Sequence, residues 1–310
     1  MAFDMRSLTG TMLGRRYFVG EVARQTRAST RFRGEDTRTG VAVHIDVVRE
    51  PRAGVDDARM GELDAMTSFH VRHPNVVTPR DIGLLAGGAP YVITDAQPGQ
   101  TLEERVTGRG ALPIADVVRI GLELLSALAA AHDLGVVHGD LRPDSLFLVE
   151  RDGLVLQTLL SGFGGSSRAD ASPAVGFGSL AFVAPEVAAG GAPTFVSDLY
   201  ACGAVLYLAA SGFPPYSPHA ASLTQLLLDG PAAAPASLRP GLPARLVRVL
   251  VEALQTSPAR RYASAREMLE ALELVRGGSA TEDTRPRAER DTFTTMRMMR
   301  AASVSAGASR

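Results

Sequence analysis

Two side chains of types that transfer protons in many enzymes lie two positions apart in the segment HDLGVVHGDLRPDSLFL, residues 132–148. They are His138 and Asp140. A histidine and an aspartate can act together in acid–base catalysis. They can equally be structural, because an aspartate in a turn accepts hydrogen bonds from nearby backbone N–H groups and a histidine can pack in a core. The pair alone leaves both interpretations open.

The types of basic residue in the chain exclude several reaction mechanisms. The chain has 32 lysines and arginines, and every one of them is an arginine. Lysine is the usual residue for Schiff-base formation and for a basic amine of lowered pKa. Those mechanisms are therefore excluded, and so is a lysine that anchors phosphate.

Length and composition limit the class of protein. The 310 residues allow two ordinary domains or one large two-lobed domain, and 45% apolar with 21% charged residues is typical of a soluble globular protein. A net charge of −1 gives no general attraction to nucleic acid or to an anionic membrane. The single Cys202 excludes an intrachain disulfide framework and a cysteine-built zinc site, and it favours a reducing, cytoplasmic location. With no apolar run of about 18 residues, we expect no membrane span.

The first third of the chain has the pattern of a small sheet. Residues 1–14 are expected to be a loose leader. Strand-like segments run from Tyr17 to Val48, with the turn sequence DTRTG between two of them. A helix is predicted over residues 56–70, and two further strands near 78–85 and 90–95. The prediction is an antiparallel sheet with one helix.

The remainder is mainly helical. Residues 114–134 carry apolar side chains at helical spacing, and two short strands, LFLV and LVLQTLL, follow. Further helices are predicted near residues 196–210, 221–229, 243–255 and 264–275. The Arg/Ser/Thr-rich tail, residues 276–310, has few large apolar side chains and is predicted to be disordered.

Six further motifs occur in a fixed order along the chain. They are VAVH (41–44), HPNVV (73–77), PYVITDAQPGQTL (90–102), GSLAFVAPE (178–186), SDLYACGAVLY (197–207) and SPARRYASAREMLEAL (257–272). Together with the His-x-Asp segment, they resemble the landmarks of a bacterial serine/threonine protein kinase domain over about residues 15–275. The resemblance implies an α+β, two-lobed kinase-like fold. A sheet-rich N-lobe (15–95) would pack on a helical C-lobe (96–275), with ATP between them and a hinge near Asp95 to Gln97.

The resemblance also identifies positions where the residues that hold phosphate and metal have been replaced. The lysine of the family's VAIK motif falls at His44. The metal-binding asparagine of the catalytic loop falls at Ser145, and the metal-binding aspartate of DFG falls at Gly162, or at Ser161 if the alignment shifts by one. No carboxylate lies between Asp152 and Asp170.

The positions that would surround the nucleotide are altered as well. Three glycines of the phosphate-covering loop allow its backbone to approach phosphate, and none of the three is glycine here. The valine above the adenine and the leucine below it are also different residues. The nucleotide positions, in chain order, are Ala23, Gln25, Ala28, Thr30 (the valine position), Ala42, His44, Thr94 (the gatekeeper) and Phe147 (the leucine position).

Other positions keep the family's residue types. Asp140 stands at the catalytic-base position, although Gly139 replaces the arginine before it. The remaining positions are structural in the family. His138 would pack, Asp198 would accept backbone hydrogen bonds from the catalytic loop, and Glu186 would pair with Arg261, with Arg260 as the neighbouring alternative. The helix acid that normally pairs with the missing lysine is Glu62 or Asp64.

We therefore predict a pseudokinase, a kinase-fold protein that acts as a signalling scaffold or allosteric module through a protein partner such as an active kinase. We expect no metal site and no cofactor beyond weak, Mg²⁺-independent ATP binding. The alternative is a weak or atypical ATP-dependent serine/threonine kinase, or another nucleotide-dependent transferase, that uses Asp140. An inert docking domain is the third hypothesis.

Overall fold

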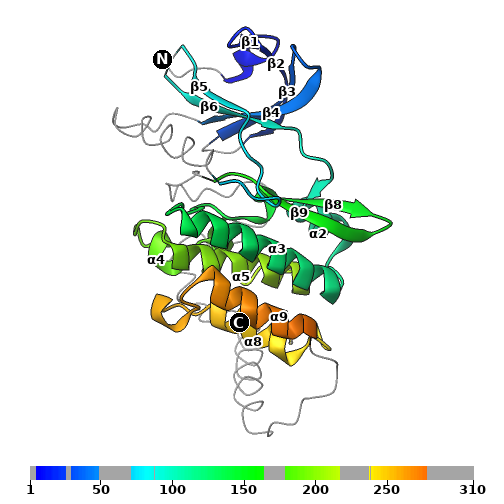
Figure 1. Ribbon diagram of the computed structural model, residues 1–310, viewed down its shortest axis with the longest axis vertical. Coiled ribbons are helices and arrows are strands. Elements are labelled where there is room, and N and C mark those ends of the chain that lie inside the picture. Colours follow the sequence, from blue (N-terminus) through cyan, green and yellow to red (C-terminus); the bar gives the residue numbers. More distant parts are fainter. Residues whose placement is uncertain are drawn as a thin grey trace, which may run out of the picture.

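The computed structural model describes residues 5–25, 29–48, 71–86, 88–163, 179–216, 237 and 239–277. Figure 1 shows an antiparallel sheet at the N-terminal end stacked on a mainly helical body. Each part has its own cluster of buried apolar side chains. The predicted α+β, two-lobed architecture is confirmed.

The sheet forms the core of the N-lobe. Its strands are β1 (Met12–Leu13), β2 (Tyr17–Gln25), β3 (Ser29–Asp36), β4 (Val41–Val48), β5 (Asp81–Leu84) and β6 (Pro90–Asp95), in the order β1-β2-β3-β4-β6-β5. All neighbours are antiparallel. Alternation of side chains along the strands buries Phe32, Val43 and Ile45 on one face. The opposite face carries His44 and faces the C-lobe.

The first residues of the described chain differ from the expected loose leader. A 3₁₀ turn, η1 (Met5–Leu8), precedes β1, and β1 pairs with β2. Leu8 and Leu13 are buried in the N-lobe core. Two isolated apolar side chains are too weak a pattern to predict a strand, but burial against the sheet is enough to order this segment.

The C-lobe is built around two long helices. Its helices are α2 (Leu102–Arg109), α3 (Ile114–Asp133), α4 (Pro185–Ala188), α5 (Phe195–Ser211), α8 (Ala244–Ala253) and α9 (Ala265–Gly277). Shorter 3₁₀ turns are η2 (Pro143–Ser145), η3 (Ser179–Phe182) and η4 (Pro258–Arg260), and strands β7 (Gln100–Thr101), β8 (Leu146–Arg151) and β9 (Leu154–Leu160) form a second sheet in the order β7-β8-β9. Helix α5 is buried along almost its whole length, and α3 packs against both α5 and α9 (Figure 1).

Local sequence signals explain where these helices begin. Thr101 caps α2 and its Oγ1 accepts the N–H of Glu104, whose carboxylate in turn accepts the N–H of Thr101. Thr194 and Ser197 make the equivalent reciprocal bonds at α5. The helices predicted at 114–134, 196–210, 243–255 and 264–275 are confirmed. Those predicted at 56–70 and 221–229 lie outside the described residues. The predicted disordered tail begins two residues too early, because α9 continues through Arg276 and Gly277, and residues 278–310 lie outside the described residues.

Candidate functional site

The carboxylate of Asp198 in α5 fixes the turn that carries Asp140. The carboxylate of Asp198 accepts the backbone N–H groups of His138 at 2.8 Å and of Gly139 at 2.9 Å, and it lies 3.0 Å from Nε2 of His132. Gly139 has φ = 79°, in the left-handed region that glycine adopts without strain. The loop is therefore held rigidly against the C-lobe core.

His138 is completely buried beneath this turn. Its Nε2 lies 3.1 Å from the carbonyl oxygen of Ser161, and its ring contacts Phe163 with 4.7 Å between ring centroids. Burial lowers the pKa of His138, because the charged form would lose its hydration. A neutral, packed histidine cannot serve as a proton carrier for solvent-borne substrates. Its contacts tie the Asp140 turn to the segment that precedes Phe163.

Asp140 projects from the turn toward the N-lobe, and its side chain remains 43% exposed. Nearby protein atoms displace part of the water around its carboxylate and raise the pKa of Asp140 to about 6, and Arg142 opposes the rise. Nε of Arg142 lies 3.3 Å from Oδ1 of Asp140. The role of Arg142 was not predicted from the sequence, where its position two residues after Asp140 was the available signal.

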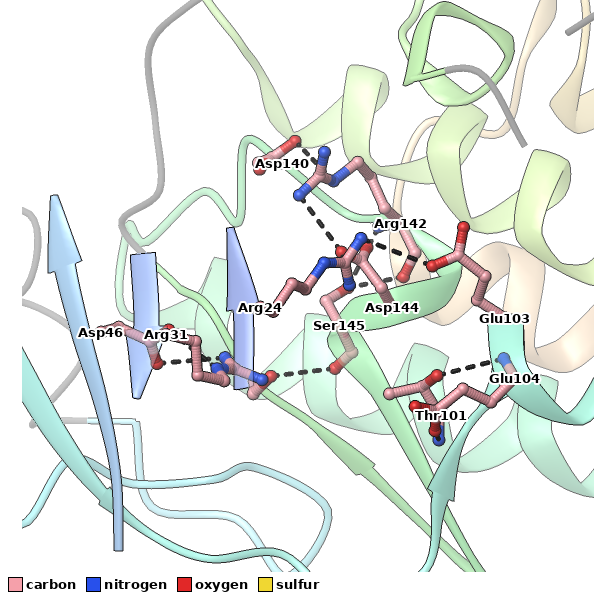
Figure 2. A network of polar contacts seen from close by, with 11 residues as sticks. Arg24, Arg31, Asp46, Thr101, Glu103, Glu104, Asp140, Arg142, Asp144 and Ser145 are labelled. Atoms are coloured by element: carbon pink, nitrogen blue, oxygen red, sulfur yellow. Dashed lines mark hydrogen bonds and ion pairs between the residues drawn. The ribbon is translucent and has the colours of Figure 1, made fainter. Parts of the chain in front are cut away.

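A chain of ion pairs continues from Arg142 across to the N-lobe, as Figure 2 shows. Arg142 lies 3.4 Å from Asp144 of η2, and Asp144 also pairs with Arg24, which extends from β2. Arg24 reaches Glu103 at the start of α2 as well, at 3.4 Å. Arg24 therefore joins the two lobes through two carboxylate partners.

A second contact joins the lobes beside this chain. His44 of β4 stacks on Phe147 of β8 with 6.1 Å between ring centroids, and the guanidinium carbon of Arg31 lies 5.7 Å above the same ring. Arg31 also makes a two-pronged ion pair with Asp46, at 2.7 and 3.0 Å. Burial, and secondarily the charge of Arg31, lowers the pKa of His44, which favours its neutral form.

The strand register changes one assignment made from the sequence. Arg33 lies directly opposite His44, so Arg31 shares the face that meets the C-lobe. Thr30 lies on the other face and is fully buried. The position above Phe147 is therefore taken by Arg31, where the sequence analysis placed Thr30. A one-residue change of register reverses which face a side chain occupies.

The other nucleotide positions are scattered along the edge of this site. Ala23 and Gln25 are exposed near the end of β2, and Ala28 lies outside the described residues. Thr94 is buried opposite His44. Ala42 is on the surface, and its carbonyl oxygen accepts the N–H of Ala96 where the chain leaves the sheet.

The residues at the two expected metal positions do not fit a magnesium ion. The Ser145 hydroxyl is used within its own turn, since it accepts the N–H of Arg142 and donates to the same residue's carbonyl oxygen. Gly162 has no side chain, and its φ of 91° favours glycine. Magnesium is bound through carboxylates together with substrate phosphates. Within the described residues, no group of three or more His, Cys, Asp or Glu side chains could hold a metal ion.

The structural ion pair of the C-lobe lies well away from this site. Arg261 binds Glu186 with both guanidinium nitrogens, at 2.6 and 2.7 Å, and its side chain has 0% exposure. It also donates to the carbonyl oxygens of Gln255 and Thr256 and packs on the ring of Tyr200. Arg261, and not the exposed Arg260, is the partner of Glu186.

Comparison with known proteins identifies the family. The family model described as "Protein kinase domain" matches residues 28–271. This match covers more than half of the chain, and the chain therefore belongs to the protein kinase domain family.

Bacterial serine/threonine kinases are among its relatives. The chain is 33% identical over 205 residues to serine/threonine-protein kinase PknK of Mycobacterium tuberculosis, an alignment that covers 64% of this chain and 18% of PknK. It is 28% identical over 290 residues to a probable serine/threonine-protein kinase PknB of Bifidobacterium longum, covering 88% and 41% of the two chains. The chain thus spans less than half the length of these relatives.

A solved structure supports the fold. The PknI kinase domain of Mycobacterium tuberculosis superimposes with a TM-score of 0.67 at 24% identity, covering 86% of this chain and 98% of that domain. This likeness concerns the fold alone. Among the described residues, no helix is long and apolar enough to cross a membrane.

Proposed function

We propose that this protein is a pseudokinase, a member of the kinase family that acts by binding a protein partner instead of transferring phosphate. The observation that supports this proposal most strongly is that side chains from the two lobes contact one another at the place where the kinase resemblance would put a nucleotide. We call this place the interlobe site and define it by Arg24, Arg31, His44 and Asp46 of the N-lobe and Glu103, Asp140, Arg142, Asp144 and Phe147 of the C-lobe.

The adenine side of the interlobe site is closed by stacking. A base would have to lie between the sheet above and Phe147 below. Arg31 and His44 already contact the Phe147 ring from the sheet side. Arg31 is held there by its ion pair with Asp46, so displacing it would break both an ion pair and a cation–π contact.

The charged side chains around the place where the triphosphate would lie do not favour binding of a polyanion. Three arginines, Arg24, Arg31 and Arg142, are each paired with carboxylates. Those carboxylates are Asp46, Glu103, Asp140 and Asp144. A triphosphate carries several negative charges and needs uncompensated cations or metal to bind. Here it would have to compete with carboxylates for each of these three arginines.

The expected loss of catalytic power is large. Removing one preorganised group that stabilises transition-state charge costs roughly 3–4 kcal/mol. The lysine and both metal ligands are replaced, and such losses are not additive. A combined loss of about 6 kcal/mol would slow phosphoryl transfer by roughly 10⁴-fold. Ordinary signalling kinases turn over at about 1–100 per second, so the remaining rate would be too low for that role.

The scaffold role follows from what the chain has retained. The residues that order the C-lobe, among them Asp198 and the Glu186–Arg261 pair, support a stable kinase fold with a defined surface. A stable fold without its chemistry acts most simply through that surface. We propose an active kinase or another signalling protein as its partner, in the cytoplasm.

A weak or atypical kinase is the second candidate, and Asp140 is the observation in its favour. Its carboxylate is exposed between the lobes, and its pKa of about 6 is suited to accepting a proton at neutral pH. Arg142 lies beside it as a cation. This candidate requires ATP to displace the ion pairs of the interlobe site before any transfer.

Thermal unfolding with ATP, with and without Mg²⁺, tests the proposal. A ligand present at a hundred times its Kd stabilises a protein by about 2.7 kcal/mol, which raises the Tm of a domain of this size by roughly 5–10 °C. We expect a shift below about 1 °C that does not depend on Mg²⁺. A catalytically active kinase domain measured in parallel is the control. A shift of several degrees that requires Mg²⁺ would contradict the pseudokinase proposal and favour the second candidate.

A further inference from the structure

Arg24 links the two lobes, and its partners come from two separate elements of the C-lobe. It lies near the end of β2 and pairs with Glu103 of α2 and with Asp144 of η2 (Figure 2). We propose that Arg24 is an internal clasp that holds the lobes closed with no nucleotide between them. The clasp rests on the proposed function, because it replaces the closure that a bound nucleotide would otherwise provide.

The register of the sheet explains why Arg24 reaches across. Arg24 and Arg31 are direct cross-strand partners in β2 and β3, so both guanidinium groups lie on the face that meets the C-lobe. Like charges placed directly opposite each other are destabilising unless each has its own counter-ion. Arg31 is neutralised within the sheet by Asp46. Among the residues that the structure describes, the carboxylates that pair with Arg24 belong to the other lobe.

A local irregularity of β2 helps to aim the side chain. The pairing between β2 and β3 shifts register between Val19 and Val22 and again between Val22 and Arg24. Such irregularities bend a strand and redirect its side chains. They bring Arg24 to the sheet's C-lobe side at the strand end, which is where η2 and α2 lie (Figure 2).

The two acceptors are firmly placed on the C-lobe. Asp144 has a side chain only 9% exposed, and it is also held by Arg142. Glu103 lies in the first turn of α2, between the two residues of the reciprocal cap, Thr101 and Glu104. Partly buried ion pairs of this kind are screened less by salt than surface pairs. A single side chain can therefore bias the angle between the lobes.

The sharpest experiment measures the interlobe distance by single-molecule FRET. Dyes attached to Glu35→Cys in β3 and Glu270→Cys in α9 report on the separation of the lobes, and native Cys202 is buried. In buffer without nucleotide, we expect one short-distance population that millimolar ATP leaves unchanged. Arg24→Gln and, separately, Glu103→Gln should each shift most molecules to a longer distance.

Matched variants separate the clasp from a general effect of charge or stability. Arg38→Gln removes an exposed arginine from the β3–β4 turn and should leave the distance unchanged. Arg24→Lys keeps the charge and should restore part of the closed population. Thermal unfolding of each labelled variant identifies the molecules that remain folded. If folded Arg24→Gln and Glu103→Gln both keep the wild-type distance, the clasp is refuted.

The FRET measurement, combined with an assay of phosphate transfer, distinguishes failure of the clasp from failure of the proposed function. A wild-type protein that is open until ATP and Mg²⁺ are added would refute both. A protein that is closed without nucleotide, but stays closed in the Arg24 and Glu103 variants, would refute the clasp alone. Opening in those variants, together with Mg²⁺-dependent phosphate transfer by the wild type, would support the clasp and refute the pseudokinase proposal.

Discussion

Buried charges in the C-lobe interior and paired charges in the interlobe site differ in what they hold together. In the C-lobe, Arg261 is surrounded by Glu186, two carbonyl oxygens and an aromatic ring, and all of these belong to the same lobe. In the interlobe site, Arg24 crosses between lobes and both partners are acidic groups at the edge of the site. The first arrangement maintains a fold, and the second, under our proposal, takes the place of a ligand.

The comparison indicates which part of the kinase framework this chain uses. Positions that order the catalytic turn and the C-lobe have the residues that the family resemblance leads one to expect. Of the positions that the resemblance assigns to the nucleotide, His44 and Phe147 stack on each other across the lobes. If this difference is the basis of function, the two regions should respond to mutation in opposite ways, with losses of stability in the first and gains of ligand access in the second.

Arg261→Ala should have the largest effect. Removing one partner of a buried ion pair typically costs about 3–5 kcal/mol, because the other charge is left without compensation. For a domain of this size, that corresponds to a fall in Tm of roughly 10 °C. Calorimetry of the purified variant measures it.

Arg260→Ala is the matched control, because Arg260 is the exposed neighbour. Surface substitutions usually change stability by less than about 0.5 kcal/mol. Equal Tm values for the two variants would show that the Glu186–Arg261 pair contributes little to the fold.

Asp198→Asn should have the next largest effect. The amide keeps one acceptor oxygen, so one of the two backbone N–H groups of the catalytic turn loses its partner. An unsatisfied buried donor costs about 1–3 kcal/mol. Chemical denaturation should show this loss, whereas Asp133→Asn, which removes an exposed carboxylate from α3, should stay within about 1 kcal/mol of wild type. If Asp198→Asn leaves the free energy of unfolding unchanged, the turn is held by other contacts.

Phe147→Leu should raise the affinity of the interlobe site for ATP. The smaller side chain removes the ring on which His44 and Arg31 stack, and it opens space for a base. We expect ATP affinity to rise by about tenfold, equivalent to about 1.4 kcal/mol. Isothermal titration calorimetry of both proteins provides the measurement. An unchanged or weaker affinity would show that stacking on Phe147 does not restrict the nucleotide.

Asp140→Asn should have the smallest effect, on the pH dependence of stability. The folded-state pKa of about 6 is higher than the value of about 3.9 for an unperturbed aspartate. Between these values the folded state binds more protons than the unfolded state, so this carboxyl makes stability fall as pH rises from about 4 to 6. In thermal unfolding at a series of pH values, Asp140→Asn should lack this fall of stability between about pH 4 and 6. A slope identical to wild type would mean that the pKa of Asp140 is not raised.

Much of the architecture could be predicted because it follows from local patterns. The spacing of apolar residues in α3 and α5 and the DTRTG turn between β3 and β4 are properties of short segments. The Glu186–Arg261 pair could be named because both residues lie in recognisable motifs. The two-residue strand β1 could not be predicted, since its order comes from pairing with β2.

The interlobe contacts were harder to predict for a physical reason. Thr30 and Arg31 exchange roles if the strand register shifts by one residue, and β2 contains two such irregularities. The partners of Arg24 are 79 and more residues away in sequence and belong to the other lobe. No local pattern specifies which carboxylates will face an arginine after the lobes pack together.

The central claim is tested most directly by transfer of radiolabelled phosphate from ATP with Mg²⁺, to the protein itself and to a generic basic protein substrate. The account predicts no incorporation above that of Asp140→Asn, even at high enzyme concentration and long times. An active kinase domain in the same assay confirms that the substrate and conditions are adequate. Incorporation that requires Mg²⁺ and disappears in Asp140→Asn would contradict the pseudokinase proposal and would establish Asp140 as the base of an arginine-rich active site.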